Sequence, residues 1–336
     1  MKAMVIEGGF GLKNLKIEER PRPEPGPGQV LVQMRAASLN YRDLMTVQGS
    51  YNPKQPLPLV PCSDGVGHVA ALGAGVTRLS VGDRVCPIFC QNWIDGPPTR
   101  DGLRSTLGGP LDGTLAEWMV VNAEGLVVPP ASLSDLECAA LPCAGVTAWT
   151  ALFTEGELRP GQTVLVLGTG GVSLFALQLA KARGARVILT SSSEEKLERA
   201  KALGADEVLN YLEHERWGRV VREMTSGRGV DHVVEVGGAG TLEESLQATA
   251  IGGRIAVIGV LSGLKAQVPV TSILMGYIRL QGVLVGPRAS FEALCAFMSE
   301  HSLKPVLGAV FPFAEARAGF ELMSRGGHFG KIALKF

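Results

Sequence analysis

A glycine-rich turn is the first feature of this sequence that could do chemistry. Residues 164–167 form a short apolar run typical of a buried strand, 168–173 read Gly-Thr-Gly-Gly-Val-Ser, and 174–183 have helical spacing. A strand, a tight turn and a helix start place free backbone N–H groups where they can bind a pyrophosphate. Ser173 replaces the third glycine of G-x-G-x-x-G, so an ordinary turn also fits the pattern. We expect a dinucleotide to bind at Gly168, Thr169, Gly170, Gly171 and Val172.

The residues at the end of the next expected strand, 186–190, indicate whether NAD(H) or NADP(H) binds. This strand end lies about 20 residues past Gly168, where an NAD site has an acidic residue for the ribose hydroxyls. This sequence has Ser191 and Ser192 there, with Lys196 close behind. Hydroxyls and an ammonium can hold a 2′-phosphate, so the composition favours NADP(H), with NAD(H) as the alternative. Ser192 and Glu195 also fit a capping box that would start a helix at 194, and both roles can hold together.

The elements that must position these residues alternate regularly from residue 161 onward. We expect strands at 164–167, 186–190, 206–209, 231–236, 253–258 and 278–285, with helices at 171–183, 194–203, 213–225, 241–249 and 271–276. Alternation of this kind predicts an α/β fold with a parallel, doubly wound sheet. Such a sheet binds its ligand at the carboxyl ends of the strands. Further cofactor contacts are therefore expected at Gly237, Gly259, Val260 and Val285.

The rest of the sequence has a different pattern. Short β-like runs separated by Pro and Gly predict a small β-rich domain at the start of the chain. We expect one or two helical turns at 39–45, a long loop at 90–113, a helix over 133–152 interrupted by Pro142, helices at 290–299 and 313–323, and a closing strand at 329–335.

Size and composition exclude several classes of protein. A chain of 336 residues predicts two domains of about 150 residues each. Lys and Arg number 32, as do Asp and Glu, so there is no basic excess for nucleic acid. No apolar run reaches the roughly 18 residues of a membrane span, and the first residues do not read as a signal peptide. We therefore expect a cytoplasmic protein, with its six scattered cysteines as free thiols.

Several ordered motifs together resemble the medium-chain dehydrogenase/reductase superfamily over nearly the whole chain. They are Asn40-Tyr41-Arg42-Asp43, Gly65-Val66-Gly67, Val81-Gly82-Asp83-Arg84-Val85, Gly113-Thr114-Leu115-Ala116-Glu117, Cys143-Ala144-Gly145-Val146-Thr147-Ala148, the glycine turn, and Gly330-Lys331-Ile332. The resemblance implies a GroES-like, β-rich catalytic domain split between 1–125 and 288–336. It also implies a Rossmann dinucleotide-binding domain at 126–287.

The zinc-binding positions of the alcohol dehydrogenases in this superfamily are mostly changed. By resemblance, the first ligand Cys falls on Asn40 and the ligand His on Ser63, and only Cys143 remains. Asn and Ser are not zinc ligands of the usual kind, so no metal is expected and the chain resembles the zinc-independent quinone-oxidoreductase branch. A rearranged metal site of Cys62, Asp64 and Cys143 is the alternative.

A metal-free site of this family predicts hydride transfer to a quinone, an enone or another activated carbonyl, because these acceptors delocalise the incoming charge. Hydrogen-bond donors would then stabilise that charge. The candidate donors are Asn40, Tyr41 and Ser63. Asp43 and Asp64 are candidate proton carriers or positioning groups, although Asp43 also fits a helix cap and Asp64 a turn. Alcohol dehydrogenase activity on alcohol/aldehyde pairs and a non-catalytic NADPH-binding role are the alternatives.

The resemblance also implies contacts outside these motifs. Thr147, Tyr211 and Lys331 fall on family positions close to the cofactor. The 278–285 strand falls on the sheet edge that pairs across a two-fold axis, which predicts a homodimer. The expected ligands are a small-molecule substrate and NADP, with no nucleic-acid or membrane partner.

Overall fold

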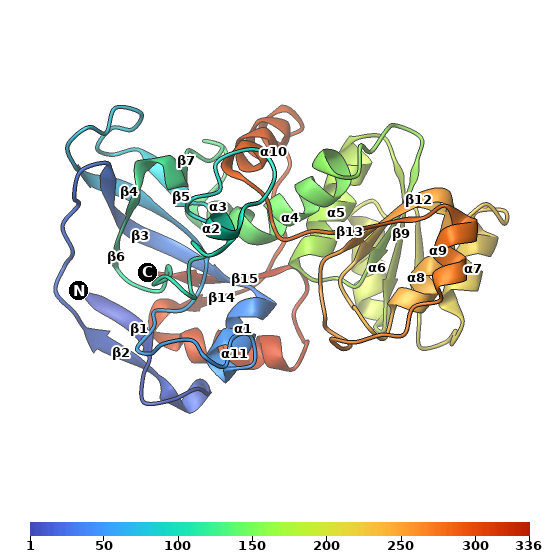
Figure 1. Ribbon diagram of the computed structural model, residues 1–336, viewed down its shortest axis with the longest axis horizontal. Coiled ribbons are helices and arrows are strands. Elements are labelled where there is room, and N and C mark those ends of the chain that lie inside the picture. Colours follow the sequence, from blue (N-terminus) through green and yellow to red (C-terminus); the bar gives the residue numbers. More distant parts are fainter. The chain divides into compact units, whose positions relative to one another are not determined.

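The computed structural model describes residues 1–336 and divides them into two compact units (Figure 1). Unit 1 comprises 1–146 and 286–336, and unit 2 comprises 147–285. The first boundary therefore lies later than the expected 125/126. The reason is that 126–146 are bonded to unit 1: β7 (Leu126–Val127) pairs with β5 (Arg84–Pro87), and Ser38 Oγ donates to Ala139 O at 2.8 Å.

Unit 1 is the expected β-rich domain. Its main sheet has the order β14-β15-β3-β4-β5-β7, and β6 pairs with β3. The bounds not yet given are β3 (Gln29–Leu39), β4 (Asp64–Leu72), β6 (Trp118–Asn122), β14 (Leu307–Pro312) and β15 (Lys331–Lys335). A separate antiparallel pair joins β1 (Lys2–Ile6) to β2 (Leu15–Glu19). Because β15 pairs with β3, Ile332 lies opposite Leu39, which brings the end of the chain to residue 40.

The helices of unit 1 range from four residues in α2 to 13 residues in α10. They are α1 (Tyr41–Gln48), α2 (Arg100–Leu103), α3 (Asp135–Ala139), α10 (Arg288–Glu300) and α11 (Ala316–Ser324), with 3₁₀ turns at Leu12–Asn14, Ala123–Gly125 and Phe313–Glu315. The expected 39–45 turns are confirmed as α1. The expected 90–113 loop contains α2.

The helix expected over 133–152 is present but irregular. After α3 it widens into a π-helix at Leu141–Gly145, continues as α4 (Val146–Trp149), and widens again at Thr150–Thr154. Pro142 has no N–H to donate to an α-helical partner, which explains the interruption there. Widened turns of this kind are frequent at functional sites, and this one carries Cys143.

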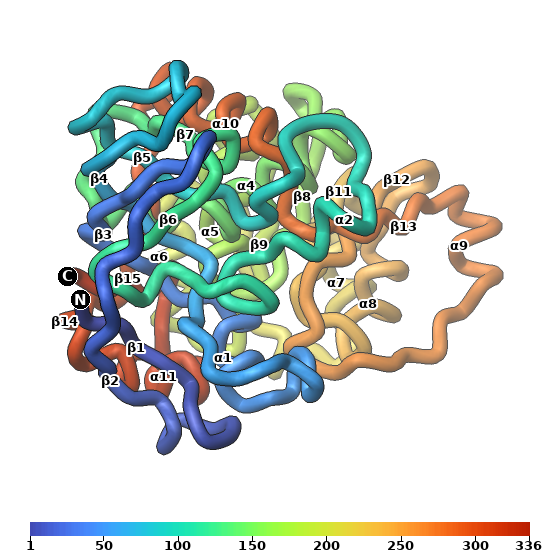
Figure 2. The backbone as a smooth tube through the Cα atoms, turned by 60° about the vertical axis from the view of Figure 1, so that its left-hand side comes forward, coloured from blue at the N-terminus to red at the C-terminus, as the bar shows by residue number.

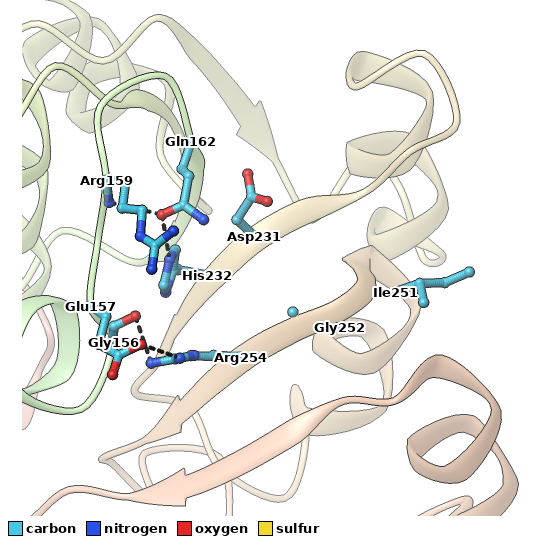
Figure 3. Close-up of a pocket in the computed structure, with 10 residues that line it drawn as sticks. Gly156, Glu157, Arg159, Gln162, Asp231, His232, Ile251, Gly252 and Arg254 are labelled. Carbon is cyan, nitrogen blue, oxygen red and sulfur yellow. Dashed lines mark hydrogen bonds and ion pairs between the residues drawn. The ribbon is translucent and has the colours of Figure 1, made fainter.

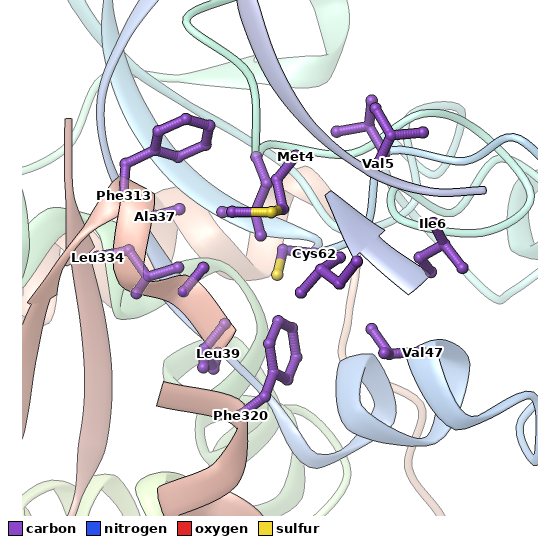
Figure 4. Close-up of a cluster of buried hydrophobic side chains, with 14 of the residues drawn as sticks. Met4, Val5, Ile6, Ala37, Leu39, Val47, Cys62, Phe313, Phe320 and Leu334 are labelled. Carbon is purple, nitrogen blue, oxygen red and sulfur yellow. The ribbon is translucent and has the colours of Figure 1, made fainter. Parts of the chain in front are cut away.

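The core of unit 1 encloses Cys62. Met4, Leu39 and Phe320 surround its side chain (Figure 4), and Cys62 has no exposed surface. Its φ of 72° is a left-handed conformation that only glycine adopts without strain. Gly113 packs on this backbone so closely that a Cβ there would lie 1.9 Å from Cys62 O. The backbone at Cys62 is therefore packed tightly against Gly113.

Unit 2 contains the expected parallel sheet, with the order β10-β9-β8-β11-β12-β13. The strands are β8 (Thr163–Leu167), β9 (Arg186–Ser191), β10 (Glu207–Asn210), β11 (Val230–Glu235), β12 (Thr249–Val257) and β13 (Arg279–Gly282). The direction of winding reverses between β8 and β11, which is where ligands bind in open α/β sheets. Residues 164–166 have no exposed surface, as expected for a strand covered on both faces.

The helices of unit 2 follow its strands in turn (Figure 2): α5 (Gly171–Ala182), α6 (Glu194–Ala202), α7 (Trp217–Met224), α8 (Leu242–Ala248) and α9 (Val270–Gly276). The helix expected from 213 begins only at 217. Asn210 Oδ1 accepts a hydrogen bond from Leu212 N at 3.1 Å, which starts a turn there instead. The last strand is also shorter than expected. None of the helices combines the length and apolar composition of a membrane span.

Candidate functional site

The glycine turn of unit 2 has the geometry of an anion-binding site. Gly168 follows β8 with φ of 73°, and Gly170 precedes the first residue of α5. No side chain caps the first turn of α5, and a Cβ on Gly170 would meet no atom within 4 Å. The N–H groups of Gly171 and Val172 are therefore open to a ligand. Ser173 Oγ donates to Leu167 O at 2.7 Å, so this serine ties the helix to the strand in the place of a third glycine.

The serine cluster is at the carboxyl end of β9, as predicted, but the cap of the following helix is different. Ser193 Oγ, not Ser192 Oγ, accepts the hydrogen bond that caps α6, from Lys196 N at 3.4 Å. The capping box expected from Ser192 and Glu195 is therefore wrong, and Ser192 is exposed. Ser191 is buried, and Tyr211, which is 39% exposed, donates from its backbone N to Ser191 O at 3.2 Å. Ser191, Ser192 and Tyr211 are thus gathered at two adjacent strand ends.

The loops after β11 and β12 are joined to each other. Ser262 N donates to Gly237 O at 2.7 Å, and a Cβ on Gly259 would lie 2.1 Å from Val236 O. The expected contact residues Gly237, Gly259 and Val260 therefore belong to one rigid surface at the carboxyl ends of the strands.

Glu235 organises this surface and was missed from the sequence. It is completely buried, and its Oε1 accepts from Gly237 N (2.8 Å), Gly238 N (3.0 Å) and Thr241 Oγ1 (2.6 Å). Ser245 Oγ donates to its other oxygen. A carboxylate with this many donors is a fixed anchor for the turn. The signal in the sequence was a lone Glu at the end of the apolar run before Gly237 and Gly238.

Thr147 and Val285 are the first and last residues of unit 2, and both are buried. Val285 has φ of 54°, a costly conformation for a β-branched side chain. Strain of this kind persists only where the surroundings enforce it, and it concentrates at ligand sites and switch regions.

The candidate catalytic residues of unit 1 form a buried polar cluster. Asn40 Nδ2 donates to Ser63 Oγ at 3.4 Å, and Ser63 Oγ donates to Asp64 Oδ1 at 2.9 Å. Asp64 Oδ2 accepts from Lys331 Nζ and from Cys143 N, both at 3.3 Å. We refer to Asn40, Ser63, Asp64, Cys143 and Lys331 as the polar cluster. Lys331 Nζ also donates to Asn40 Oδ1 and to Leu39 O, which leaves no N–H for the cofactor contact expected of it.

Two other candidates lie at the start of α1. Asp43 Oδ2 accepts from Asn40 N at 2.9 Å and completes a capping box, so its interpretation as a helix cap is confirmed. Burial raises the pKa of Asp43 to about 6, although the adjacent Arg42 guanidinium opposes the shift. Tyr41 is 42% exposed and lies outside the buried cluster.

Arg42 ties the cluster to the 90–113 loop. Its Nη1 donates to Leu107 O at 2.8 Å and its Nη2 to Gly109 O at 3.0 Å. The guanidinium also lies over the ring of Tyr51, at 4.8 Å from the centroid. This loop packs on the backbone of Cys62, because a Cβ on Gly108 would be 2.7 Å from Cys62 N. Arg42 therefore supports the residue that precedes Ser63.

The residues of the polar cluster do not fit a zinc ion. Structural and catalytic zinc sites use thiolate, imidazole and carboxylate ligands, and Asn40 and Ser63 supply none of these. The oxygens of Asn40 and Asp64 face the Lys331 ammonium, whose charge would repel a metal ion. No group of three or more His, Cys, Asp or Glu side chains is placed to hold a metal. In the alternative set, Cys62 lies in the apolar core, and burial raises the pKa of its thiol well above the usual value, which disfavours the thiolate that a metal ion binds.

A cavity of about 150 Å³ lies at the amino ends of the unit 2 strands (Figure 3). His232 contacts Gln162 Oε1 there at 3.1 Å, and Arg254 is paired with Glu157 at 2.6 Å. Burial lowers the pKa of His232 to about 4, which keeps the imidazole neutral. None of the expected cofactor residues lines this cavity.

The structure has a glycine turn at the switch point of a parallel sheet, and its β-rich unit contains a buried cluster of hydrogen-bond donors. Together these features are typical of a nicotinamide-dependent oxidoreductase. Residues 26–131 match the family described as "Alcohol dehydrogenase GroES-like domain", and 171–300 match "Zinc-binding dehydrogenase". The chain is 43% identical over 332 residues to a zinc-type alcohol dehydrogenase-like protein of Schizosaccharomyces pombe, covering 97% of this chain and 96% of that protein. It is 31% identical over 346 residues to an acryloyl-coenzyme A reductase of Metallosphaera sedula, covering 99% of each.

Solved structures agree. A crystal structure of an NAD-dependent alcohol dehydrogenase superposes with a TM-score of 0.91 at 38% identity, covering 100% of both chains. A mycobacterial protein complexed with NADPH superposes with a TM-score of 0.84 at 28% identity, also covering 100% of both. The chain therefore belongs to the medium-chain dehydrogenase/reductase superfamily, and it is an oxidoreductase of the NAD(P)-dependent, alcohol dehydrogenase-like type.

Proposed function

We propose that this protein reduces a quinone, an enone or another activated carbonyl with NADPH, without a catalytic zinc ion, as in the zinc-independent quinone-oxidoreductase branch. The observation that carries the proposal is the polar cluster itself. Where zinc enzymes of the superfamily have ligands, this chain has Asn40 and Ser63. Ser63 Oγ donates to Asp64, and the Asn40 carboxamide, with Lys331 Nζ 2.6 Å from its Oδ1, has the N–H that can donate to an acceptor oxygen. Donors of this kind can stabilise the oxygen of a delocalised anion. An unconjugated ketone localises more charge and needs stronger polarisation.

In this proposal the two units have different tasks. Unit 2 binds the nicotinamide cofactor, which supplies the hydride and sets the intrinsic chemistry. The polar cluster of unit 1 receives the acceptor oxygen. Asp64 accepts hydrogen bonds from Ser63, Cys143 and Lys331, so it acts as an anchor of the cluster and not as a proton donor. Protons for the reduced product then come from water.

One relative supports the reduction of activated C=C bonds. The Metallosphaera sedula enzyme is named for acryloyl-coenzyme A, whose double bond is conjugated to a thioester carbonyl. An enone has the same conjugated arrangement. We therefore include α,β-unsaturated thioesters among the activated carbonyls to be tested.

The preference for NADP(H) rests on the end of β9. No carboxylate is present at Ser191 or Ser192 to repel a 2′-phosphate, and Lys196 is on the first turn of the next helix. The neighbouring structure with bound NADPH supports this preference, whereas the NAD-dependent one keeps NAD(H) open as the alternative.

The test is a set of oxidation assays with NADPH and with NADH over quinones, enones, unsaturated thioesters, aldehydes and alcohols, with metal analysis of the same sample. We expect turnover of the conjugated acceptors with NADPH and less than 0.1 zinc per chain as an order-of-magnitude bound. Turnover of alcohol/aldehyde pairs alone, or zinc near one per chain, would support the alcohol dehydrogenase alternative. Tight NADPH binding without any turnover would support a non-catalytic role.

We also propose that the protein is a homodimer paired through unit 2. All four residues of the edge strand β13 are exposed, and α9 buries none of its residues. The apolar side chains Val270, Leu274, Met275 and Tyr277 are each more than 70% exposed. An open strand edge beside so much exposed apolar surface favours a second copy of the same chain as partner.

A further inference from the structure

Lys331 is a buried cation with a complete set of hydrogen-bond acceptors. It is the first residue of β15 and is 3% exposed. Its Nζ donates to Asn40 Oδ1 at 2.6 Å, to Leu39 O at 3.0 Å and to Asp64 Oδ2 at 3.3 Å. An ammonium has three N–H donors, so each of them has an acceptor. The position of the charge is therefore determined by the fold and not by a mobile side chain.

The polar cluster compensates the charge of Lys331 internally. A buried ammonium is costly unless it is paired and hydrogen-bonded. Asp64, with no exposed surface, supplies the opposite charge, and the carbonyl dipoles of Leu39 and Asn40 supply the remaining acceptors. The second buried cation, Arg42, is paired separately with Asp43 at 3.2 Å. The cluster thus contains a resident positive charge in the region where related enzymes place a metal ion.

This contact determines how the Asn40 carboxamide is oriented. Because lysine can only donate, the atom facing Nζ must be the oxygen of Asn40, and its NH₂ group points the other way. One N–H of that group donates to Ser63 Oγ at 3.4 Å. Ser63 Oγ donates its only hydrogen to Asp64 Oδ1 at 2.9 Å, so Ser63 has no donor left for a ligand. The second N–H of Asn40 is the donor that remains.

Asn40 is also the most accessible of the four hydrogen-bonding side chains, although the Cys143 residue of the cluster is more exposed. Asn40 is 9% exposed, compared with 3% for Lys331 and none for Ser63 and Asp64. Among these hydrogen-bonding side chains, a ligand oxygen that approaches the cluster can therefore reach the Asn40 N–H most easily. The Lys331 ammonium withdraws electron density from the carboxamide oxygen, which makes that N–H a stronger donor.

We propose that Lys331 is a positioning residue that acts through Asn40: it fixes the carboxamide with one N–H free for the acceptor oxygen and supplies the positive charge that a metal would supply elsewhere. This inference rests on the proposed function, because it assumes that the cluster receives the acceptor oxygen. It replaces the expectation that Lys331 binds the cofactor.

A double-mutant cycle tests the proposal. The full chain would be prepared as wild type, Lys331→Met, Asn40→Ala and the double variant, and kcat would be measured with saturating NADPH and the best acceptor from the set above. We expect Lys331→Met to lower kcat by roughly 10- to 100-fold, as for loss of a hydrogen bond to a charged group. In the Asn40→Ala background, Lys331→Met should lower kcat by less than about 3-fold, because the effects of two residues that act together are not additive. An equal cost in both backgrounds would overturn the proposal.

Cofactor affinity separates this role from the expected cofactor contact of Lys331. NADPH binding, followed by quenching of protein fluorescence, should be unchanged in Lys331→Met. Weaker NADPH binding with an unchanged kcat would show that Lys331 serves the cofactor after all. Lys335→Met is the matched control, since it removes an exposed lysine from the same strand, and it should leave both quantities unchanged.

A further variant guards against failure to fold. Lys331→Arg keeps the positive charge and should have a higher kcat than Lys331→Met. If the Lys331→Met variant does not fold, the same double-mutant cycle is run with Lys331→Arg. An Arg variant that loses as much kcat in the Asn40→Ala background as in wild type would overturn the proposal. Wild-type protein that binds NADPH but reduces no acceptor would instead remove the proposed function, and this inference with it.

Discussion

Lys331 Nζ donates a 2.6 Å hydrogen bond to Asn40 Oδ1 across 291 positions of the chain. Pairing of β15 with β3 makes this contact possible, because Ile332 lies opposite Leu39. The contact converts an asparagine, which could point either way, into a donor of defined direction.

Loss of this donor should be costly. We expect Asn40→Ala to lower kcat by roughly 10²- to 10³-fold, the usual cost of removing a donor to a developing oxyanion. The KM for NADPH should change little, since Asn40 belongs to unit 1. Steady-state kinetics with both substrates varied would check this. A variant with wild-type kcat would mean that the acceptor oxygen does not bind at the polar cluster.

The end of β9 should control the choice of cofactor. In Ser191→Asp, a carboxylate repels the 2′-phosphate and can accept hydrogen bonds from the ribose of NADH. We expect the ratio of kcat/KM for NADPH to that for NADH to fall by about 10- to 100-fold. Ser193→Ala is the control: it removes the cap of α6, costs about 1 kcal/mol of stability, and should leave the ratio unchanged. A similar change of the ratio in both variants would contradict a 2′-phosphate site at Ser191.

Glu235 should control cofactor affinity through the shape of its loop. In Glu235→Gln the charge is lost and one side-chain oxygen becomes an NH₂ that cannot accept, so a donor among Gly237 N, Gly238 N, Thr241 Oγ1 and Ser245 Oγ is left unpaired. We expect the Kd for NADPH to rise about 10-fold, with a lower Tm.

A second, partly buried contact in unit 2 provides the comparison. Glu244 Oε2 accepts from Gly218 N at 2.7 Å and joins α8 to α7. Glu244→Gln should therefore lower Tm without changing the Kd for NADPH. If Glu235→Gln and Glu244→Gln raised the Kd for NADPH equally, Glu235 would affect cofactor binding only through the overall stability of unit 2.

The Asp43 carboxyl should make stability depend on pH in a defined direction. Burial raises its pKa from 3.8 to about 6 in the folded protein, so the native state binds the extra proton between these values. Stability from this group is therefore greatest at low pH and falls as the pH rises from about 4 to about 6. The full effect is on the order of 3 kcal/mol.

Comparison of wild type with Asp43→Asn by urea unfolding at several pH values isolates this group. Asn keeps the shape of the cap but does not titrate. The unfolding free energy of wild type minus that of Asp43→Asn should decrease by up to about 3 kcal/mol between pH 4 and pH 6. Above pH 6 this difference should stay constant. A difference that moved in favour of wild type over this range would mean that pairing with Arg42 outweighs burial.

The proposed dimer should depend on α9. Leu274 is 71% exposed in the monomer, and Leu274→Asp would place a charge in the expected interface. We expect the mass in solution to fall from about twice 35.4 kDa to that of a single chain. Ile251→Asp, at an equally exposed apolar position of unit 2, should leave the mass unchanged. A wild-type monomer at micromolar concentration would exclude the dimer.

Much of the fold was predictable because it depends on local patterns. The apolar run at 164–167, the glycine turn and the alternation that follows are properties of neighbouring residues, and they predicted the parallel sheet and the place of the open N–H groups. Asn210 starts a turn before α7, so the expected helix start at 213 was wrong, and Ser193 caps α6 in place of Ser192 although that helix begins at 194 as expected. Competition among adjacent polar side chains for the same N–H groups is not resolved by sequence spacing.

The sequence by itself determined the family, the two kinds of domain, and the candidate residues of the site. Only the tertiary structure decided what Asn40, Asp43, Glu235 and Lys331 do. Each of these side chains takes its role from partners: Asp43 from its cap and Arg42, Glu235 from the turn it anchors, and Asn40 and Lys331 from each other. The charge, direction and accessibility of a buried polar group depend on which atoms surround it. For Lys331 those atoms come from strands whose pairing no local pattern specifies.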